Sequence, residues 1–385
     1  MNQYLVLGAG KMGVVLARDL IESDEENRVT LADIDARHLR RARDFIRSRR
    51  LEIRQMNVED KNQRKEIFRG KDVALSALLH RHSLLALDAA FQAGVHFVDL
   101  AGEYPLPRLE YDQKARSKGI TLLSGMGVSP GITNVCVGRA VYLLDEAEKA
   151  LIYVGGNPVR PRPPLKYRIV YAVDSLLNFY ERKVTIFKNG KVMEVPPLTG
   201  VETISFGAPF DSMECFFTDG LSSLLYTMRG KIKEELWEKT IRHCGHSKEV
   251  QTLKDCGLFS TRPIRVHDQK VIPRDVLEVL LDSRMKLGRE RDVTLMSVIV
   301  SGKKSGKPRT YVFEMIDPYD ASKNYTSMAR TTCFPASIAA QMILSGMIRK
   351  RGSLFPEQVF HARLFNPFME ELRKRGVEIA YRIES

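Results

Sequence analysis

The chain has 385 residues, of which 44% are apolar, and a formal net charge of +13 at pH 7. This length exceeds the usual size of one domain, so we expect two domains. Its apolar runs are far shorter than the ~18 residues of a membrane span. The first apolar strand follows Met1 without an export signal, which predicts a soluble, cytoplasmic protein.

The basic surplus and the five cysteines need no special partner. Arginines and lysines are spread through helical stretches such as residues 35–50, where a solvated face accounts for them. We therefore expect no nucleic-acid and no membrane partner, only attraction of small anions. The cysteines form no C-x-x-C pair, which argues against a disulfide framework and a thiolate zinc site.

The first 128 residues alternate short apolar runs with helical patterns. Runs rich in Val, Ile and Leu predict strands that are buried on both faces of a parallel sheet. Six such units predict a doubly wound α/β Rossmann domain over residues 1–128. The expected strands are residues 4–7, 28–33, 51–58, 72–79, 95–101 and 119–125, and expected helices include residues 83–93 and 108–118.

The remainder follows an antiparallel pattern. Asn189-Gly190 predicts a hairpin over residues 183–195, and a basic turn divides a second hairpin over residues 292–316. We expect an α+β domain with a mixed sheet over residues 129–330, for substrate binding and oligomerisation, with helices on one face. Residues 331–385 are expected to form helices that return toward the first domain. Helices are predicted at residues 130–143, 247–258, 273–287 and 335–347, with an irregular crossing at residues 155–166.

Three glycines follow the first strand in the pattern G-x-G-x-x-G. Gly8 permits a tight turn, Gly10 lets the backbone approach a pyrophosphate, and Gly13 permits close packing of helix on strand. The helix that begins here offers free N–H groups and its positive dipole end to phosphates. The pattern predicts a dinucleotide site. The expected cofactor contacts are Gly8, Gly10, Lys11, Met12, Gly13, Asp33, Leu78, Leu79 and His80.

Asp33 ends the second strand, twenty residues after the last of these glycines. A carboxylate here accepts hydrogen bonds from ribose hydroxyls and repels a 2′-phosphate, which favours NAD over NADP. Two alternatives stay open. Asp35 competes as the ribose ligand, and Arg37, Arg40 or Arg41 folds back onto a phosphate.

Seven sequence blocks carry a resemblance that runs nearly end to end. They are GAGKMG, ALDAAFQAGVHFVDLAGE, GMGVSPGITN, YERKVTIFKNGKVMEVPPL, DGLSSLLYT, KTIRHCGHSKEVQTLKDCGLF and TTCFPASIAAQMI. In this order they resemble the saccharopine dehydrogenase family, and within it the lysine 6-dehydrogenases. His80, His82, Cys244 and Cys333 depart from the family pattern and leave the substrate open.

The resemblance implies an NAD-dependent oxidoreductase acting on the CH–NH2 group of an amino acid. The expected reaction is oxidative deamination of the ε-amine of L-lysine to the semialdehyde. An ε-amine has a pKa near ~10.4 and must lose a proton before hydride departs, so a proton acceptor is required beside the substrate. The family also implies a homo-oligomer that covers the edges of the mixed sheet.

Two segments supply the expected active-site residues. In the loop after the fifth strand, Glu103 is a candidate proton carrier, and Asp99 and Tyr104 are substrate ligands. The structural alternatives are a turn cap for Asp99 and an exposed loop charge for Glu103.

In the block TIRHCGH, Arg242 could clamp a substrate carboxylate and His246 could carry the proton. Tyr180 and Arg182 form a second carboxylate site. The alternatives are a surface ion pair for Arg242 and a helix cap for His246. No metal is expected, because His243 and its neighbours lack a fourth ligand.

Two other functions compete with the expected one. A saccharopine-type reductase would join a semialdehyde to glutamate, with NADPH and a second carboxylate site, and Asp33 weighs against it. A non-catalytic dinucleotide sensor would keep the fold without groups that handle protons.

Overall fold

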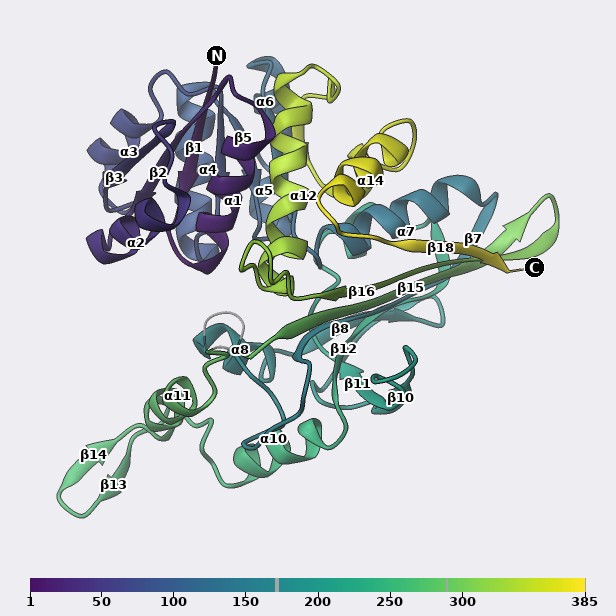
Figure 1. Cartoon of the computed structure of the whole chain (residues 1–385). Coiled ribbons are helices and arrows are strands. Elements are labelled where there is room, and N and C mark those ends of the chain that lie inside the picture. Colours follow the sequence, from purple (N-terminus) through teal and green to yellow (C-terminus); the bar gives the residue numbers. More distant parts are fainter. Residues whose placement is uncertain (170–172, 289, 385) are drawn as a thin grey trace.

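The first sheet contains seven parallel strands and carries the N-terminus (Figure 1). The computed structural model describes residues 1–169, 173–288 and 290–384. The strand order is β17-β6-β5-β4-β1-β2-β3, which confirms the predicted doubly wound fold. Its elements are β1 (Asn2–Leu7), α1 (Lys11–Ser23), β2 (Asn27–Asp33), α2 (Ala36–Ile46), β3 (Leu51–Gln55), α3 (Lys61–Ile67), β4 (Val73–Ser76), α4 (His80–Ala93), β5 (His96–Asp99), α5 (Pro105–Leu109), α6 (Asp112–Ser117), β6 (Thr121–Ser124) and β17 (Gly352–Leu354).

Apolar side chains project from both faces of this sheet, as expected for central parallel strands. Strands β4 and β6 are buried along their whole length. One face packs on α1 and α2 through residues such as Leu16 and Leu39, and the other packs on α4 and α6 through Leu87 and Ala115. Because the helices cover the two faces of the sheet, the carboxyl ends of the strands remain free for ligand binding.

The second sheet has nine strands and is mixed. Its main path is β10-β11-β12-β7-β15-β16-β18, in which β12 and β7 are parallel, and β8 and β9 extend from β12. Its strands are β7 (Glu146–Pro158), β8 (Val184–Lys188), β9 (Lys191–Val195), β10 (Glu202–Ile204), β11 (Met213–Phe217), β12 (Ile232–His243), β15 (Asp292–Lys304), β16 (Lys307–Pro318) and β18 (Ala380–Glu384).

The remaining helices lie around this sheet or between it and the first sheet, and a separate two-stranded sheet projects from the molecule (Figure 1). The projecting strands are β13 (Ile264–Val266) and β14 (Gln269–Val271). The helices are α7 (Ile132–Leu143), α8 (Val173–Phe179), α9 (Leu224–Thr227), α10 (His246–Asp255), α11 (Pro273–Arg284), α12 (Ser327–Leu344), α13 (Pro356–Val359) and α14 (Phe365–Lys374). No described helix is both long and apolar enough to span a bilayer.

Both predicted hairpins form. Strands β8 and β9 pair around Asn189 and Gly190, which have positive φ angles of 52° and 75°. Such angles are those of the turn that joins two strands with matching twist. Strands β15 and β16 pair along their length, from Val293 with Pro318 to Lys304 with Lys307.

Three sequence expectations are corrected. The helix expected at residues 335–347 begins at Ser327, because Thr326 caps it and tertiary packing buries the turn around Pro335. The helix expected at residues 108–118 is divided into α5 and α6. The crossing expected to be irregular from residue 155 is regular to Pro158, because β15 pairs with it.

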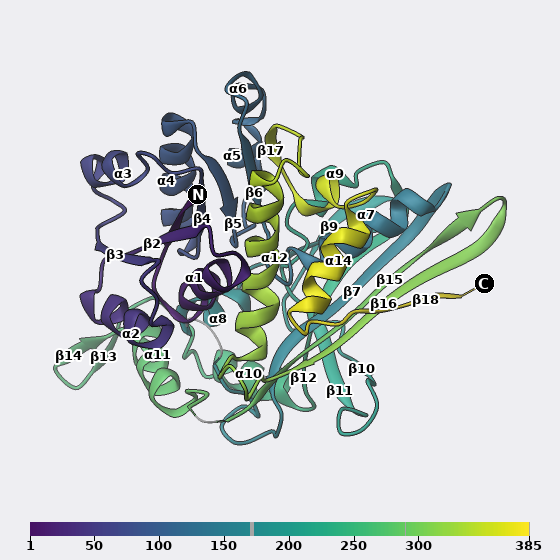
Figure 2. The same ribbon diagram turned by 45° about the horizontal axis from the view of Figure 1, so that its top comes forward.

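The C-terminal part of the chain returns to the first sheet. Helix α12 lies beside α1, and β17 pairs with β6 (Figure 2). The Cys333 thiol, on α12, donates to the carbonyl oxygen of Met12 at 3.1 Å. The chain then crosses back, and β18 pairs with β16. The division at residues 128 and 330 stays a prediction.

Candidate active site

The glycine turn has the geometry of a phosphate-binding turn. Gly8 has φ +96°, and a Cβ there would lie 2.9 Å from the carbonyl oxygen of Ala77. A Cβ on Gly13 would lie 1.7 Å from the carbonyl oxygen of Gly8, whereas one on Gly10 would meet nothing within 4 Å. The backbone of Gly10 thus faces open space at the start of α1, where no side chain caps the helix. This arrangement fits a bound pyrophosphate.

Asp33 is anchored beside this turn. Its carboxylate accepts the N–H of Ala9 at 2.6 Å and the N–H of Asp35 at 2.7 Å. These bonds leave further acceptor positions on both oxygens for ribose hydroxyls. Asp35 pairs with Arg37 at 2.7 Å, so these two alternative ligands are engaged with each other, while Arg40 and Arg41 stay alternatives for a phosphate.

The other expected cofactor contacts surround the same turn. Lys11 is exposed, and Met12 is partly buried against α12. Neighbouring protein atoms partly desolvate the Lys11 ammonium group and lower its pKa, whereas the carboxylates of Asp282 in α11 and Asp292 in β15 raise it. Leu79 precedes α4 and is exposed.

Leu78 packs against the first glycine, since its Cδ2 lies 3.3 Å from the position of a Cβ on Gly8. His80 begins α4, and its side chain lies outside the described part of the structure.

Asp99 is completely buried and supports the loop after β5. Its carboxylate accepts hydrogen bonds from Arg108 at 2.7 Å, from the N–H of Ala101 at 3.0 Å and from Ser83. Arg108, also fully buried, donates to the carbonyl oxygen of Glu103 at 2.8 Å. Asp99 therefore has a structural role, as in the alternative given for it above: it holds the loop in place and does not face a substrate.

Four charged or polar side chains meet where this loop faces the second sheet. The Cζ of Arg182 lies 5.7 Å from the ring centroid of Tyr104, which is exposed. Burial raises the pKa of Asp219, Arg182 opposes the rise, and Glu103 adds to it. We name Glu103, Tyr104, Ser129, Arg182, Asp219 and Glu238 the interdomain cluster.

Glu238 forms the buried side of the interdomain cluster. Its Oε2 accepts a hydrogen bond from the Ser129 hydroxyl at 2.6 Å. A Cβ on Gly220 would lie 1.7 Å from Glu238 Oε1, so a side chain at position 220 would displace this carboxylate. Burial raises the pKa of Glu238 to about 7; the Ser129 hydrogen bond opposes this shift and the Asp219 charge adds to it.

His246 lies in a separate, buried hydrogen-bonded group. Its Nδ1 contacts the carbonyl oxygen of Leu165 at 2.6 Å, and its Nε2 lies 2.8 Å from the Tyr180 hydroxyl. Arg242 donates through Nε to the same hydroxyl at 3.3 Å and lies over the Tyr167 ring at 4.5 Å. Burial, reinforced by the Arg242 charge, lowers the pKa of His246 to about 3. His246 is therefore neutral and enclosed, which differs from the expected proton shuttle.

Sequence reasoning did not single out Ser129, Asp219 or Glu238. Asp219 and Gly220 lie in the block DGLSSLLYT, and Ser129 lies in GMGVSPGITN. These blocks carry the family resemblance, and neither indicates by itself that the two side chains lie near Glu238. Glu238 lies within the apolar-charged alternation of β12, where nothing in the local pattern marks it.

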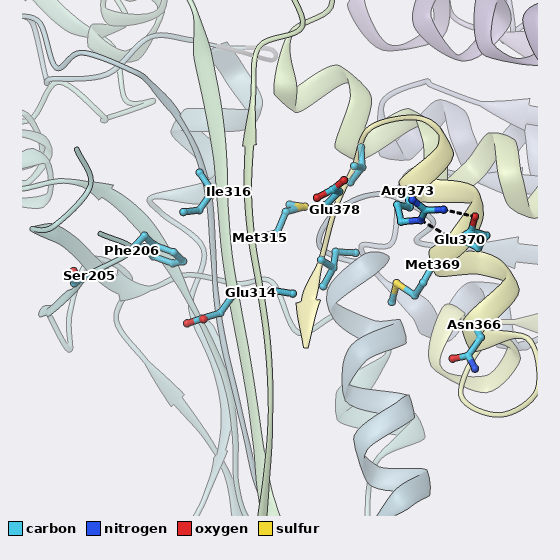
Figure 3. Close-up of a pocket in the computed structure, with 13 residues that line it drawn as sticks. Ser205, Phe206, Glu314, Met315, Ile316, Asn366, Met369, Glu370, Arg373 and Glu378 are labelled. Atoms are coloured by element: carbon cyan, nitrogen blue, oxygen red, sulfur yellow. Dashed lines mark hydrogen bonds and ion pairs between the residues drawn. The ribbon is translucent and has the colours of Figure 1, made fainter. Parts of the chain in front are cut away.

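Two cavities lie away from these residues. One of about 730 Å³ is bordered by β16, α14 and the segment that leads into β18. Figure 3 shows Arg373 and Glu370 on one side of it and Phe206 on the other. A second, of about 580 Å³, borders β1 and α12. In the residues described, no three His, Cys, Asp or Glu side chains group as metal ligands.

Two family models cover almost the whole chain. The saccharopine dehydrogenase NADP binding domain matches residues 4–123, and the saccharopine dehydrogenase C-terminal domain matches residues 127–377. The chain belongs to the saccharopine dehydrogenase family. The family confirms the resemblance seen in the sequence blocks, and it places the glycine turn in a dinucleotide-binding domain.

Relatives of this chain carry the names of different enzymes. The chain is 22% identical to the NADP(+), L-glutamate-forming saccharopine dehydrogenase of Schizosaccharomyces pombe, over 98% of each chain. It is 21% identical to the carboxyaminopropylagmatine dehydrogenase of Synechocystis sp., over 98% of this chain and 96% of the relative. It is 23% identical to the carboxynorspermidine synthase of Vibrio alginolyticus, over 97% and 95%.

A solved structure shares the fold of this saccharopine dehydrogenase family member. The apo histidine-tagged saccharopine dehydrogenase (L-Glu forming) from Saccharomyces cerevisiae aligns over 100% of both chains with a TM-score of 0.82 and 19% identity. Together these relationships establish a dinucleotide-binding oxidoreductase that acts on amino-acid or amine groups.

Proposed function

We propose that the protein catalyses NAD-dependent oxidative deamination of the ε-amine of L-lysine to the semialdehyde. The observation that carries this proposal is the interdomain cluster, which brings three carboxylates and one arginine together beyond β5 and β6 of the cofactor sheet. A cationic substrate is attracted to such a surplus of negative charge. Bound NAD would supply the hydride acceptor.

The interdomain cluster divides the tasks of binding. Arg182 is partly exposed and lies near the Tyr104 ring, and it can hold the α-carboxylate through its planar pair of donors. Glu103 and Asp219 can hold ammonium groups. The Asp99–Arg108 pair keeps the loop in place, so that the substrate carbon is held in a fixed orientation.

In this proposal the buried group around His246 holds the surrounding segments in position and does not bind the substrate. Arg242 and Tyr180 are both buried, and the Arg242 guanidinium also donates to the carbonyl oxygen of Ile241 at 2.8 Å. We assign the substrate carboxylate to Arg182 because it lies in the interdomain cluster.

Asp33 favours NAD in this proposal. Its anchored carboxylate would accept from the ribose and repel a 2′-phosphate. Three fungal relatives are named for NADP(+), so the preference is a property proposed for this chain and tested directly by comparing the two cofactors.

A second candidate is a reductase that forms a CH–NH bond between a carbonyl compound and an amine, with NADPH. The names of the relatives favour it, since they include saccharopine dehydrogenases and a carboxynorspermidine synthase. Such a substrate carries carboxylates at two ends and needs a second cationic site, which Arg242 would have to provide.

A spectrophotometric panel tests the proposal. Amines, amino acids and saccharopine-type secondary amines are each supplied with NAD or NADP, and formation of the reduced nicotinamide is recorded. Reduction with lysine and NAD supports the proposal. Reduction only with a secondary amine and NADP supports the reductase, and would refute lysine deamination.

Substitution of Arg182 tests the binding assignment. Arg182→Lys should raise KM for lysine about thirtyfold, because loss of one bidentate contact costs ~2 kcal/mol, while kcat changes less. A simple amine without a carboxylate should be used equally by both enzymes. Arg162→Lys, at an exposed ion pair, is the matched control. An equal penalty for amine and amino acid would show that Arg182 does not bind the carboxylate.

We also propose a homo-oligomer in the cytoplasm. Strands β10 and β18 end the main path of the mixed sheet, and β18 exposes Tyr381 and Ile383. Association would cover such edges.

A further inference from the structure

Among the described residues, Glu238 lacks the arginine partner that several buried carboxylates of the chain have. Asp19, Asp99 and Asp317 each pair with an arginine guanidinium. Glu238 instead accepts from the Ser129 hydroxyl, and the charge beside it is the carboxylate of Asp219. A buried carboxylate that is held by a hydroxyl and faces a like charge is poorly stabilised as an anion.

The structure also makes room for this carboxylate. Gly220 has no side chain where Glu238 Oε1 lies, so the backbone of the loop before α9 closes on the carboxylate. Ser129 comes from the loop after β6 in the cofactor sheet, and it is partly exposed whereas Glu238 is 3% exposed. The hydroxyl therefore connects the buried carboxylate to the carboxyl end of the cofactor sheet.

We propose that the Ser129 hydroxyl and Glu238 form the proton acceptor for the amine oxidised at this site. The amine N–H bond breaks and its proton passes to Ser129 Oγ, while the hydroxyl's own proton passes to Glu238 Oε2. The amine becomes neutral and Glu238 becomes a carboxylic acid, so protons balance and no electrons move in this step. The inference rests on the proposed amine oxidation, and it assigns the proton to a pair that replaces His246.

The charges around Glu238 support this assignment. Burial raises its pKa to about 7, Ser129 opposes this, and Asp219 adds to it. Asp219 in turn interacts with Arg182 and Glu103, so the cluster couples substrate binding to the charge on Glu238. A general base with a pKa near the working pH is efficient in both directions of proton transfer.

The kinetic test compares pH profiles. Wild-type kcat/KM for amine oxidation should fall as pH drops below about 7, because Glu238 is then protonated. Glu238→Gln should lower kcat by roughly 10²–10⁴-fold and remove that limb. Ser129→Ala should also lower kcat, and Ser129→Thr, which retains a hydroxyl, should restore most of it. Glu234→Gln, at an exposed position of the same strand, is the matched control and should behave as wild type.

A second measurement reads the proton without catalysis. Infrared difference spectra between pH 5.5 and pH 8.5 should show a carboxylic-acid band that is smaller in Glu238→Gln than in wild type and Glu234→Gln. Part of the band should remain, because burial raises the pKa of Asp317 to about 6 and this group titrates in the same range. Loss of part of the band shows that Glu238 titrates in this range, and persistence of the whole band in Glu238→Gln would overturn the proposal.

The outcomes separate the two levels of inference. If wild type oxidises an amine and Glu238→Gln has the same rate and pH limb, the proton pair is wrong and the proposed function stands. If the wild type oxidises no amine in the panel, the proposed function is wrong. The proposed proton transfer from an amine to Ser129 and Glu238 is then wrong as well, whatever the infrared band shows. A Glu238→Gln protein that does not fold is detected by its loss of circular dichroism, and Ser129→Ala and Ser129→Thr then decide by their rates.

Discussion

Replacing Gly10 or Gly13 of the cofactor turn by alanine adds the same methyl group, but the two substitutions should have different effects. A Cβ at Gly13 would lie 1.7 Å from the carbonyl oxygen of Gly8, against the 3.0 Å below which real contacts essentially never fall. Helix α1 or the turn must then move by the difference of 1.3 Å. A Cβ at Gly10 meets nothing within 4 Å, and its φ of −74° and ψ of −169° suit alanine.

Gly13→Ala should therefore destabilise the protein itself. Overpacking of this kind costs ~3 kcal/mol, which corresponds to a decrease in Tm of roughly 4 °C for a chain of 385 residues that unfolds as one unit. Gly10→Ala should leave Tm within a degree or two of wild type, since it removes only backbone freedom from the unfolded chain. It should instead weaken NAD binding by at least roughly tenfold, or ~1.4 kcal/mol, because the methyl group occupies the approach of the pyrophosphate.

Differential scanning fluorimetry without cofactor and calorimetric titration with NAD measure the two effects separately. The expected result is a loss of Tm in Gly13→Ala and a loss of affinity at unchanged Tm in Gly10→Ala. If Gly10→Ala binds NAD as wild type does, the pyrophosphate does not pass over this turn. If Gly13→Ala keeps its Tm, helix and strand are not in the contact described.

Four further outcomes are expected. Asp33→Ala should lower NAD affinity by roughly 10- to 150-fold and narrow the difference in affinity between NAD and NADP, because a charge-assisted ribose bond worth ~1.5–3 kcal/mol and a repulsive charge are both lost; an unchanged cofactor ratio in steady-state assays would exclude Asp33 as the ribose ligand. Arg108→Met should lower the stability to urea by ~3–5 kcal/mol, since it leaves the buried carboxylate of Asp99 without its partner; a change below ~1 kcal/mol would contradict the buried pair. The pKa of His246 is about 3 in the folded protein and 6.5 is its usual value, so between these pH values only the unfolded chain binds a proton at this ring. The free energy of unfolding should therefore fall by ~2 kcal/mol from pH 7 to pH 5. His246→Gln should reduce that loss, and an identical pH slope in both proteins would show that this ring is not buried as a neutral base. Light scattering should give a mass that is a multiple of 43.8 kDa, and a monomer at every concentration would reject the oligomer.

Local chemistry explains why the sequence predicted the cofactor turn and both hairpins. Gly8 and Gly13 are required by backbone geometry within a few residues, and Asn189-Gly190 sets its turn by its own positive φ angles. Alternating apolar runs likewise predict a parallel sheet, because burial on both faces demands continuous apolar strands. These features need no knowledge of distant residues.

The candidate site depended on contacts between distant segments. Ser129 and Glu238 are 109 positions apart, and Asp219 joins them from a third segment. Nothing near Glu238 in the sequence indicates that it is buried beside a hydroxyl and a second carboxylate. Desolvation and neighbouring charge determine what a carboxylate can do, and both arise only when the two sheets pack together.

The same reason accounts for the residues whose expected roles changed. Asp99, Arg242 and His246 have the chemistry of catalytic or binding groups, but the fold encloses each of them in hydrogen bonds to its own chain. The sequence by itself determined the cofactor turn and the two kinds of sheet, because these rest on local backbone requirements and periodic burial, and its ordered blocks carried the resemblance to the family. Only the tertiary structure decided which acids and bases are buried, exposed or paired, because exposure and partners are properties of packed segments rather than of residue type.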